Sequence, residues 1–151
     1  MQREKEIHEI EVHVAGLCIR ESSGDIDFLI GKRAADRLIF PGFWECGGGQ
    51  VHKGESFVDA VKFHMKEEFG IDVEVLFPFA TYRIELKDKM IPGLRFICRI
   101  KNGETVNIDQ QELVDFRWIS LKEIDNFDMI PGLIEEIKTG LSYYQKIRTG
   151  Q

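Results

Sequence analysis

The sequence predicts an α/β fold in which a mixed β-sheet lies between helices. Three observations lead to this fold class. Strand-like segments outnumber helical ones, the clearest helix lies in the middle of the chain, and one or two further helices come near its end. No internal repeat, low-complexity tract or linker divides the 151 residues. We therefore expect a single domain over residues 1–151.

The N-terminal third predicts two strands and a loop. Residues 10–19 first alternate apolar and polar side chains and then become mainly apolar, which is typical of a strand that enters a core. Residues 22–25, Ser-Ser-Gly-Asp, indicate a turn, and residues 26–30 are expected to return from it. Residues 38–52 are rich in glycine and aromatic residues without a regular period, which predicts a long loop.

Residues 56–69 form the clearest predicted helix. Ser56 and Asp59 have the spacing of a capping box at its start, and Gly70 is suited to the residue that follows its end. At about 100° per residue, one side of this helix is apolar and is expected to face the core. The residues on that side are Phe57, Val58, Val61, Met65 and Phe69.

The remainder of the chain predicts strands followed by helices. The expected strands are residues 73–76, 79–86, 94–100 and 114–119, with turns at 87–93 and 101–103. Ser120 and Glu123 form a second possible capping box, which would open a short helix. Pro131 suits the first position of the last helix. Apolar residues recur there at helical spacing: Leu133, Ile134, Ile137 and Leu141.

Composition narrows the class of function. Hydrophobic residues make up 43% and charged residues 30% of the chain, as in ordinary soluble proteins, and no apolar stretch is long enough to span a membrane. Residues 1–6 are charged and unlike a signal peptide, and the three cysteines are widely spaced, so we expect a cytoplasmic protein without a disulfide framework. The net charge of −6 and the lack of a basic run argue against nucleic-acid binding. An anionic substrate would therefore need a metal ion as intermediary.

Three side chains of the predicted helix at 56–69 suggest a metal site. His64, Glu67 and Glu68 are three or four residues apart and are expected to converge beside the core face. Neither glutamate has a lysine or arginine at that spacing, so the two carboxylates would repel each other unless they shared a divalent ion. The helix alone also allows a plainer interpretation, in which residues 66–68 are a solvated charged face.

The glycine-rich segment and the helix together strongly resemble the Nudix box, G-x5-E-x7-R-E-U-x-E-E-x-G-U, where U is aliphatic. The matching residues, without insertion or deletion, are Gly49, Glu55, Met65, Glu67, Glu68, Gly70 and Ile71. Trp44-Glu45 upstream resembles the approach to the box in MutT-like members. Glu112 and the pair Arg117-Trp118 downstream are similar to a further stretch of the family.

The resemblance implies a Nudix α/β/α sandwich that binds Mg²⁺ or Mn²⁺ and cleaves a nucleoside diphosphate derivative by attack of a metal-activated water on phosphorus. It implies metal ligands at Gly49, Glu67, Glu68 and Glu112, with Glu112 as the expected base. Lys32 and Arg33 are expected near phosphate, although a plain surface pair fits them equally well. Trp44-Glu45 favours a nucleoside triphosphate over ADP-ribose or a dinucleoside polyphosphate. A homodimer is an expectation from the family.

The box departs from the family pattern at Phe63-His64, which replace an Arg-Glu pair. Phe63 cannot form the expected ion pair with Glu55. His64 can accept a proton near neutral pH, so it joins the catalytic candidates, and it can ligate a softer metal than magnesium. Gly47 replaces a proline, which is expected to loosen the loop. These departures leave three alternatives: an active pyrophosphohydrolase, a sensor or regulator that binds nucleotide with little turnover, and a diphosphate isomerase.

Several nearby residues allow a plainer interpretation. Cys46, His52 and His64 do not have the spacing of a zinc site. The aromatic side chains of Phe40, Phe43 and Trp44 can stack on a base or pack in the core. Trp118 is expected to pack in the core.

Overall fold

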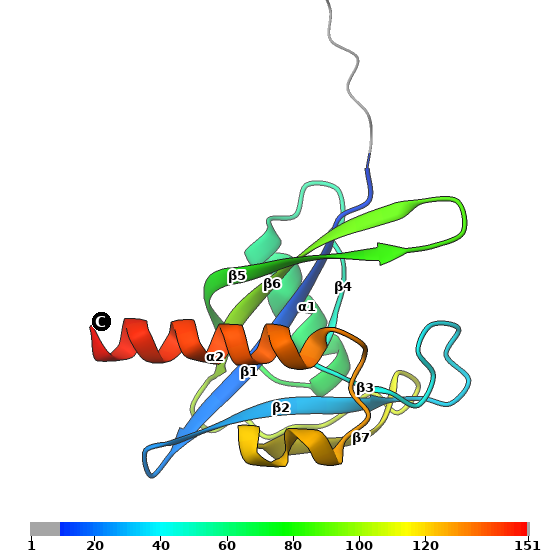
Figure 1. Cartoon of the computed structure of the whole chain (residues 1–151). Coiled ribbons are helices and arrows are strands. Elements are labelled where there is room, and N and C mark those ends of the chain that lie inside the picture. The colour runs from blue at the N-terminus through cyan, green and yellow to red at the C-terminus, as the bar shows by residue number, and fades with distance from the viewer. Residues whose placement is uncertain (1–9, 151) are drawn as a thin grey trace, which may run out of the picture.

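A mixed sheet with one long helix on each face makes up the computed structural model, which describes residues 10–150 (Figure 1). The predicted α/β/α sandwich is therefore confirmed. The charged segment 1–6, for which no signal peptide was expected, lies outside the described residues. Within them, no helix has the length and apolarity needed to cross a membrane.

Within residues 10–150, seven strands form the sheet. They are β1 (His13–Ser22), β2 (Asp25–Arg33), β3 (Trp44–Glu45), β4 (Gly48–Gln50), β5 (Val73–Glu85), β6 (Met90–Ile100) and β7 (Leu113–Ile119). The helices are α1 (Phe57–Phe69), the 3₁₀ helix η1 (Leu121–Asn126) and α2 (Leu133–Thr149). The main order is β3-β2-β1-β6-β5, while β4 pairs with β1 and β7 pairs with β2. β1 and β6 run parallel and the other strand pairs run antiparallel, which makes the sheet mixed as predicted.

The central strand β1 has a divided edge. Along one edge it pairs with β6 from His13 to Ile19. Along the other edge, its first residues pair with β4 and its last residues pair with β2. Since β2 also pairs with β3, the short strands β3 and β4 lie where β1 and β2 separate, and α1 packs behind them (Figure 1). This is the part of the fold that carries the candidate site.

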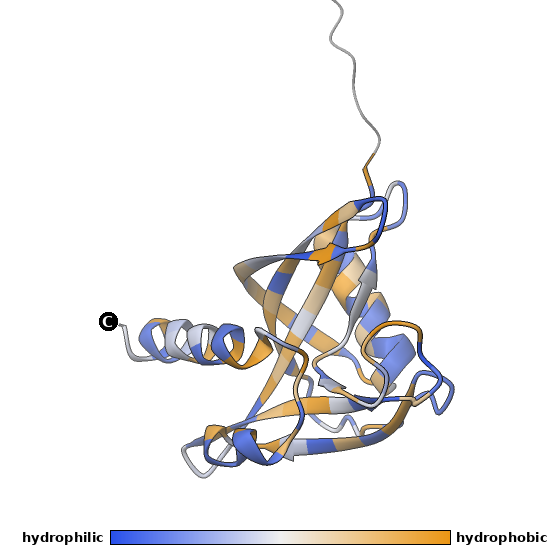
Figure 2. Ribbon diagram, turned by 45° about the vertical axis from the view of Figure 1, so that its right-hand side comes forward, coloured by the Kyte–Doolittle hydropathy of each residue, from blue (hydrophilic) through white to orange (hydrophobic). Residues whose placement is uncertain are grey.

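Two apolar layers hold the sandwich together, one on each face of the sheet. Leu17 and Ile19 of β1 belong to the layer that includes Ile137 and Leu141 of α2. Val14 and Cys18, which alternate with them along the strand, belong to the layer that includes the buried side of α1. Figure 2 shows the central strands largely in the apolar colour, whereas the helices alternate between apolar and polar residues.

Three strand predictions need correction. Residues 38–52 are not one loop, because β3 and β4 lie within them; ladder bonds from a glycine-rich backbone require no side-chain period. The predicted strands 73–76 and 79–86 are one strand, β5, whose register shifts on both sides of Pro78. A proline is tolerated there because β5 is an edge strand with bulges. β6 begins at Met90, so only residues 87–89 remain of the expected turn at 87–93.

The helices follow the sequence signals closely. Ser56 caps α1 through its Oγ atom, which accepts the Asp59 N–H at 3.0 Å, and Gly70 ends α1 with a φ of 68°. The capping box at Ser120 is present. However, Phe57 and Val58 in the first turn of α1 are exposed, so the apolar contact of α1 begins one turn later than predicted. Pro131 is not the first residue of α2, because Gly132 in a left-handed conformation precedes Leu133.

Candidate functional site

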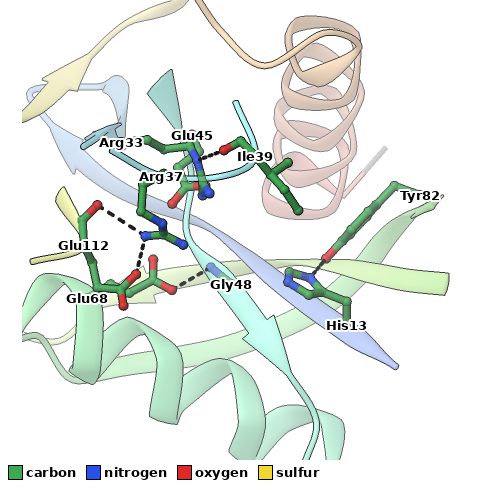
Figure 3. Close-up of polar contacts among 9 residues, drawn as sticks. All are labelled: His13, Arg33, Arg37, Ile39, Glu45, Gly48, Glu68, Tyr82 and Glu112. Atoms are coloured by element: carbon green, nitrogen blue, oxygen red, sulfur yellow. Dashed lines mark hydrogen bonds and ion pairs between the residues drawn. The ribbon is translucent and has the colours of Figure 1, made fainter. Parts of the chain in front are cut away.

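Five charged side chains meet beside β3 and β4 and form what we term the carboxylate–arginine cluster (Figure 3). Each comes from a different element or connection: the end of β2, the loop after it, the end of β3, the last turn of α1 and the residue before β7. Those residues are Arg33, Arg37, Glu45, Glu68 and Glu112. The fold thus brings Glu45, Glu68 and Glu112 together, although they are far apart in the sequence.

Glu68 is the buried centre of this cluster. The residue is 8% exposed, and its Oε1 atom accepts the Gly48 N–H at 3.2 Å. Its Oε2 atom has no hydrogen-bond partner among the described residues. Burial raises the pKa of Glu68, and the charges of Glu45 and Glu112 raise it further; the Gly48 N–H and Arg37 act in the opposite direction. Because a buried acceptor without a partner is costly, the Oε2 atom is suited to a cationic ligand.

The other two carboxylates each have an arginine partner. Arg33 donates through Nη1 to the Oε2 atom of Glu45 at 2.6 Å, and through Nε to the Ile39 carbonyl oxygen at 2.9 Å. Arg37 donates through Nη1 to the carboxylate of Glu112. Two of the three carboxylates are therefore neutralised by the protein itself, and Glu68 is left with the incomplete partner set.

The predicted convergence of His64, Glu67 and Glu68 is incomplete. Glu68 faces the cluster, while Glu67 is exposed. His64 lies against β4, where its Nε2 atom donates to the Gln50 carbonyl oxygen at 2.8 Å. Its ring covers Gly49, since a Cβ atom on that glycine would lie 2.2 Å from the imidazole Cε1 atom. In residues 10–150, no three histidine, cysteine, aspartate or glutamate side chains lie close enough to hold a metal ion.

The glycine-rich segment is more tightly packed than the sequence suggested. Gly47 has a φ of 98°, and its carbonyl oxygen accepts the Gly16 N–H at 3.1 Å. A Cβ atom on Gly47 would lie 2.8 Å from the ring of Phe69. A proline could not adopt this φ, so the glycine is required by the backbone conformation, and the expectation that it loosens the loop stays a prediction. The Gly48 N–H contacts the Glu68 carboxylate. Gly49, which was predicted to be a metal ligand, lies against the His64 ring.

The remaining candidates occupy plainer positions. Trp44 is 8% exposed and packs edge-on against Phe127 with ring centroids 5.0 Å apart, so the core-packing alternative describes it. Lys32 pairs through its backbone with β3 and β7. Without an arginine at position 63, Glu55 instead accepts the His52 N–H at 3.0 Å. Trp118 packs partly in the core, as expected, with the Arg20 guanidinium 4.3 Å from its ring centroid.

A second polar group, which we term the buried network, was missed from the sequence. It consists of His13, Tyr82, Arg95 and Glu136. The Tyr82 hydroxyl and the Nδ1 atom of His13 are 2.5 Å apart, and the Arg95 guanidinium lies 4.8 Å from the Tyr82 ring centroid. Arg95 donates through Nε to the Oε2 atom of Glu136 at 2.7 Å. The available signal was Arg95 itself, a charged residue inside an apolar strand segment.

Burial sets the protonation of this network. The pKa of His13 falls from 6.5 to about 4, chiefly because of burial and then because of the nearby charges of His64, Arg95 and Arg33. Burial also raises the pKa of Tyr82. At neutral pH the imidazole and the phenol are therefore uncharged, and the arginine and glutamate neutralise each other.

Comparison with known proteins identifies the family that this chain resembles. The family model of the NUDIX domain matches residues 11–138. A nucleoside triphosphatase, NudI of Escherichia fergusonii, is 31% identical over 114 residues, which cover 68% of this chain and 79% of that protein. An RNA pyrophosphohydrolase of Campylobacter jejuni is 31% identical over 109 residues, covering 64% and 69% respectively.

Solved structures agree with the fold. A C. elegans Ap4A hydrolase in a binary complex superposes with a TM-score of 0.75 at 18% identity, covering 90% of this chain and 98% of that one. The MutT protein from Methanosarcina mazei Go1 gives a TM-score of 0.66 at 25% identity, covering 80% and 83%. The sheet, the two flanking helices and the segment that carries the cluster thus belong to a known architecture.

Proposed function

Because the chain belongs to the NUDIX domain family and is a hydrolase, we propose that it cleaves a nucleoside triphosphate at a phosphoanhydride bond. Two features support this choice of substrate. Trp44-Glu45 resembles the segment that precedes the box in MutT-like members. A relative that is 31% identical to this chain is named a nucleoside triphosphatase. The net charge of −6 also favours a reaction in which a cation accompanies the anionic substrate.

The unpartnered Oε2 atom of Glu68 is the observation that carries this proposal. An oxygen with this burial and no donor fits a hard divalent cation such as Mg²⁺ or Mn²⁺, which prefers carboxylate ligands. Glu68 would hold the cation together with Glu112 from beside β7. Glu67, from the same helix turn as Glu68, is exposed and would have to turn its side chain towards the cluster to join them. When bound, such a cation would neutralise phosphate oxygens and lower the pKa of the attacking water.

The protein's own side chains supply the remaining roles. Glu112 is the proposed general base, because it lies at the cluster, is partly exposed and can take a proton from water. Arg33 is held rigidly by Glu45 and the Ile39 carbonyl, so it can orient a phosphate group without moving. His64 ties α1 to β4 through the Gln50 carbonyl, and it would keep Glu68 aligned beside Gly48.

A panel of nucleoside triphosphates, incubated with magnesium and manganese in parallel, tests this proposal. We expect metal-dependent release of phosphate or pyrophosphate, detected by ion chromatography. ADP-ribose and a dinucleoside polyphosphate belong in the panel as competing substrate classes. Saturable nucleotide binding without turnover under every condition would contradict hydrolysis and favour the sensor or regulator.

A further inference from the structure

Arg37 lies between two of the carboxylates that the proposed function requires (Figure 3). It belongs to the loop that joins β2 to β3. Its Nη1 atom donates to the Glu112 carboxylate and lies 3.4 Å from the Glu112 carbonyl oxygen. Its positive charge also acts on Glu68, where it opposes the rise in pKa that burial causes. The Arg37 guanidinium thus pairs with Glu112 and also lies close enough to Glu68 for its charge to act on that carboxyl group.

This arrangement is incomplete as an ion-pair network. Arg37 satisfies Glu112 but leaves the Oε2 atom of Glu68 without a partner, although that atom is buried. In the described part of the chain no three potential ligand side chains are close enough for a metal ion. Glu45 and Glu112 are thus paired with arginines, and the Oε2 atom of Glu68 is the acceptor of the cluster that has no donor among the described residues.

The two arginines of the cluster differ in how firmly they are held. Arg33 and Glu45 have side chains only 11% and 15% exposed, and Arg33 has the Ile39 carbonyl as a second acceptor. Arg37 and Glu112 have side chains 30% and 45% exposed. A partly exposed ion pair is weak compared with a buried, doubly bonded one. Arg37 can therefore leave its partner at low cost, whereas Arg33 cannot.

We propose that Arg37 is an exchangeable counter-ion: it holds Glu112 while the divalent cation is absent, and it transfers to a phosphate group of the substrate when the cation binds. The inference rests on the proposed function. A guanidinium binds carboxylate and phosphate through the same fork of N–H donors, so the exchange needs only a side-chain rotation. Backbone bonds at both ends of the loop, from Arg37 N–H to Ala34 and from Phe43 N–H to Phe40, can remain in place.

The exchange predicts effects of opposite sign in one variant. Arg37→Gln removes the competitor of the metal, so Mn²⁺ alone should bind about 2- to 5-fold more tightly than in the wild type. The same variant loses a charged phosphate ligand. An ATP analogue with methylene groups in place of both bridging oxygens of the triphosphate cannot be cleaved at either link. Titrated at saturating Mn²⁺, it should bind about 10- to 100-fold more weakly.

Isothermal titration calorimetry on the full chain measures both affinities. Arg117→Gln is the matched control, because Arg117 forms an exposed ion pair with Asp115 on β7. This control should change neither affinity. Arg37→Lys keeps the charge but loses the fork, and it should restore part of the nucleotide affinity while weakening Mn²⁺ binding relative to Arg37→Gln.

The possible outcomes separate the inference from the proposed function. Tighter Mn²⁺ binding with weaker nucleotide binding, or Mn²⁺ binding in Arg37→Gln alone, supports the exchange. Weaker Mn²⁺ binding in Arg37→Gln would mean that Arg37 merely positions Glu112, and unchanged affinities would mean that it does neither; both results overturn the exchange while the metal site stands. If neither wild type nor variant binds Mn²⁺, the metal site of the proposed function fails together with the exchange.

Discussion

The carboxylate–arginine cluster and the buried network are neighbouring polar groups in the same sandwich, but only one of them is complete. In the buried network, Arg95 has Glu136 as its partner and His13 has the Tyr82 hydroxyl. In the cluster, three carboxylates share two arginines, and the Oε2 atom of Glu68 has no partner. A polar group with all its partners contributes to stability, whereas one with a missing partner costs stability and indicates a ligand. The comparison therefore supports the proposed function of the carboxylate–arginine cluster, and it predicts that the buried network serves folding.

Glu68→Gln should give the largest effect, and it tests the cluster. The amide keeps an oxygen for the Gly48 N–H but loses the charge that would hold a divalent cation. We expect the rate of nucleotide cleavage to fall about 10²- to 10⁴-fold. The free energy of unfolding should stay equal or rise, because burial raises the pKa of Glu68 and folding therefore disfavours its charged form at neutral pH.

Urea denaturation and steady-state kinetics on the same preparations provide the two measurements. Glu74→Gln is a suitable control, since Glu74 is an exposed glutamate that pairs with Arg99 on the strand surface. That variant should keep full activity. The result that would contradict this is a fall in the free energy of unfolding as large as the rise in the activation free energy. Glu68 would then be a structural residue, and the cluster would not differ from the buried network.

Arg95→Leu tests the buried network and should have the opposite profile. Arg95 is 9% exposed, and its removal leaves the carboxylate of Glu136 without a partner in a largely buried position. Breaking a buried ion pair from one side costs about 3–5 kcal/mol in the free energy of unfolding. Arg99→Leu on the same strand breaks an exposed pair and should cost about 1 kcal/mol or less. Equal losses from both variants would show that the network adds nothing beyond a surface ion pair.

The sequence predicted the elements of this fold better than the groups that they bring together. Helix α1 was defined by local signals, Ser56 at its start and Gly70 at its end, and both act as predicted. β3 and β4 were missed because backbone bonds to segments distant in the sequence define them, and such bonds leave no period in the side chains. Local rules thus suffice for a helix and fail for a two- or three-residue strand.

The candidate site divides in the same way. Glu68 was found from its helical spacing, and Glu112 from a family pattern. Arg37 was not found, because 75 residues separate it from Glu112 and neither segment carries a sign of the other. Helical spacing alone also could not tell the buried Glu68 from the exposed Glu67, since that depends on which side of α1 meets β4.

A smaller effect is expected in the pH dependence of stability. Burial, and then the nearby charged groups on other elements, lower the pKa of His13 to about 4 in the folded chain, against 6.5 in a free histidine. The groups that face it are the Tyr82 hydroxyl, His64, Arg95 and Arg33. Between these pH values the unfolded chain binds a proton that the folded chain does not. The free energy of unfolding therefore reaches its full value, as far as His13 is concerned, above pH 6.5, and it falls as the pH is lowered towards 4. The difference amounts to at most about 3 kcal/mol.

His13→Asn isolates this contribution. Urea midpoints measured between pH 4 and pH 7 should fall less steeply with acidification in the variant than in the wild type. His52→Asn is the control, because the His52 side chain is 65% exposed and should leave the slope unchanged. If His13→Asn and the wild type lose stability in parallel, the histidine is not held neutral by the network.

The smallest expected effect comes from removing one hydroxyl of the buried network, with Tyr82→Phe. The ring would stay in place, because it packs directly on Gly93, where a Cβ atom would collide with it, and because the Arg95 guanidinium lies over its face. Only the bond to the Nδ1 atom of His13 would be lost, which should cost about 1 kcal/mol in the free energy of unfolding. Tyr143→Phe, at a tyrosine that is 45% exposed, is the matched control and should cost nearly nothing. Because the network is not expected to touch the reacting groups, the cleavage rate of Tyr82→Phe should equal that of the wild type. A rate loss without a stability loss would reverse the comparison and assign the hydroxyl to the substrate rather than to the fold.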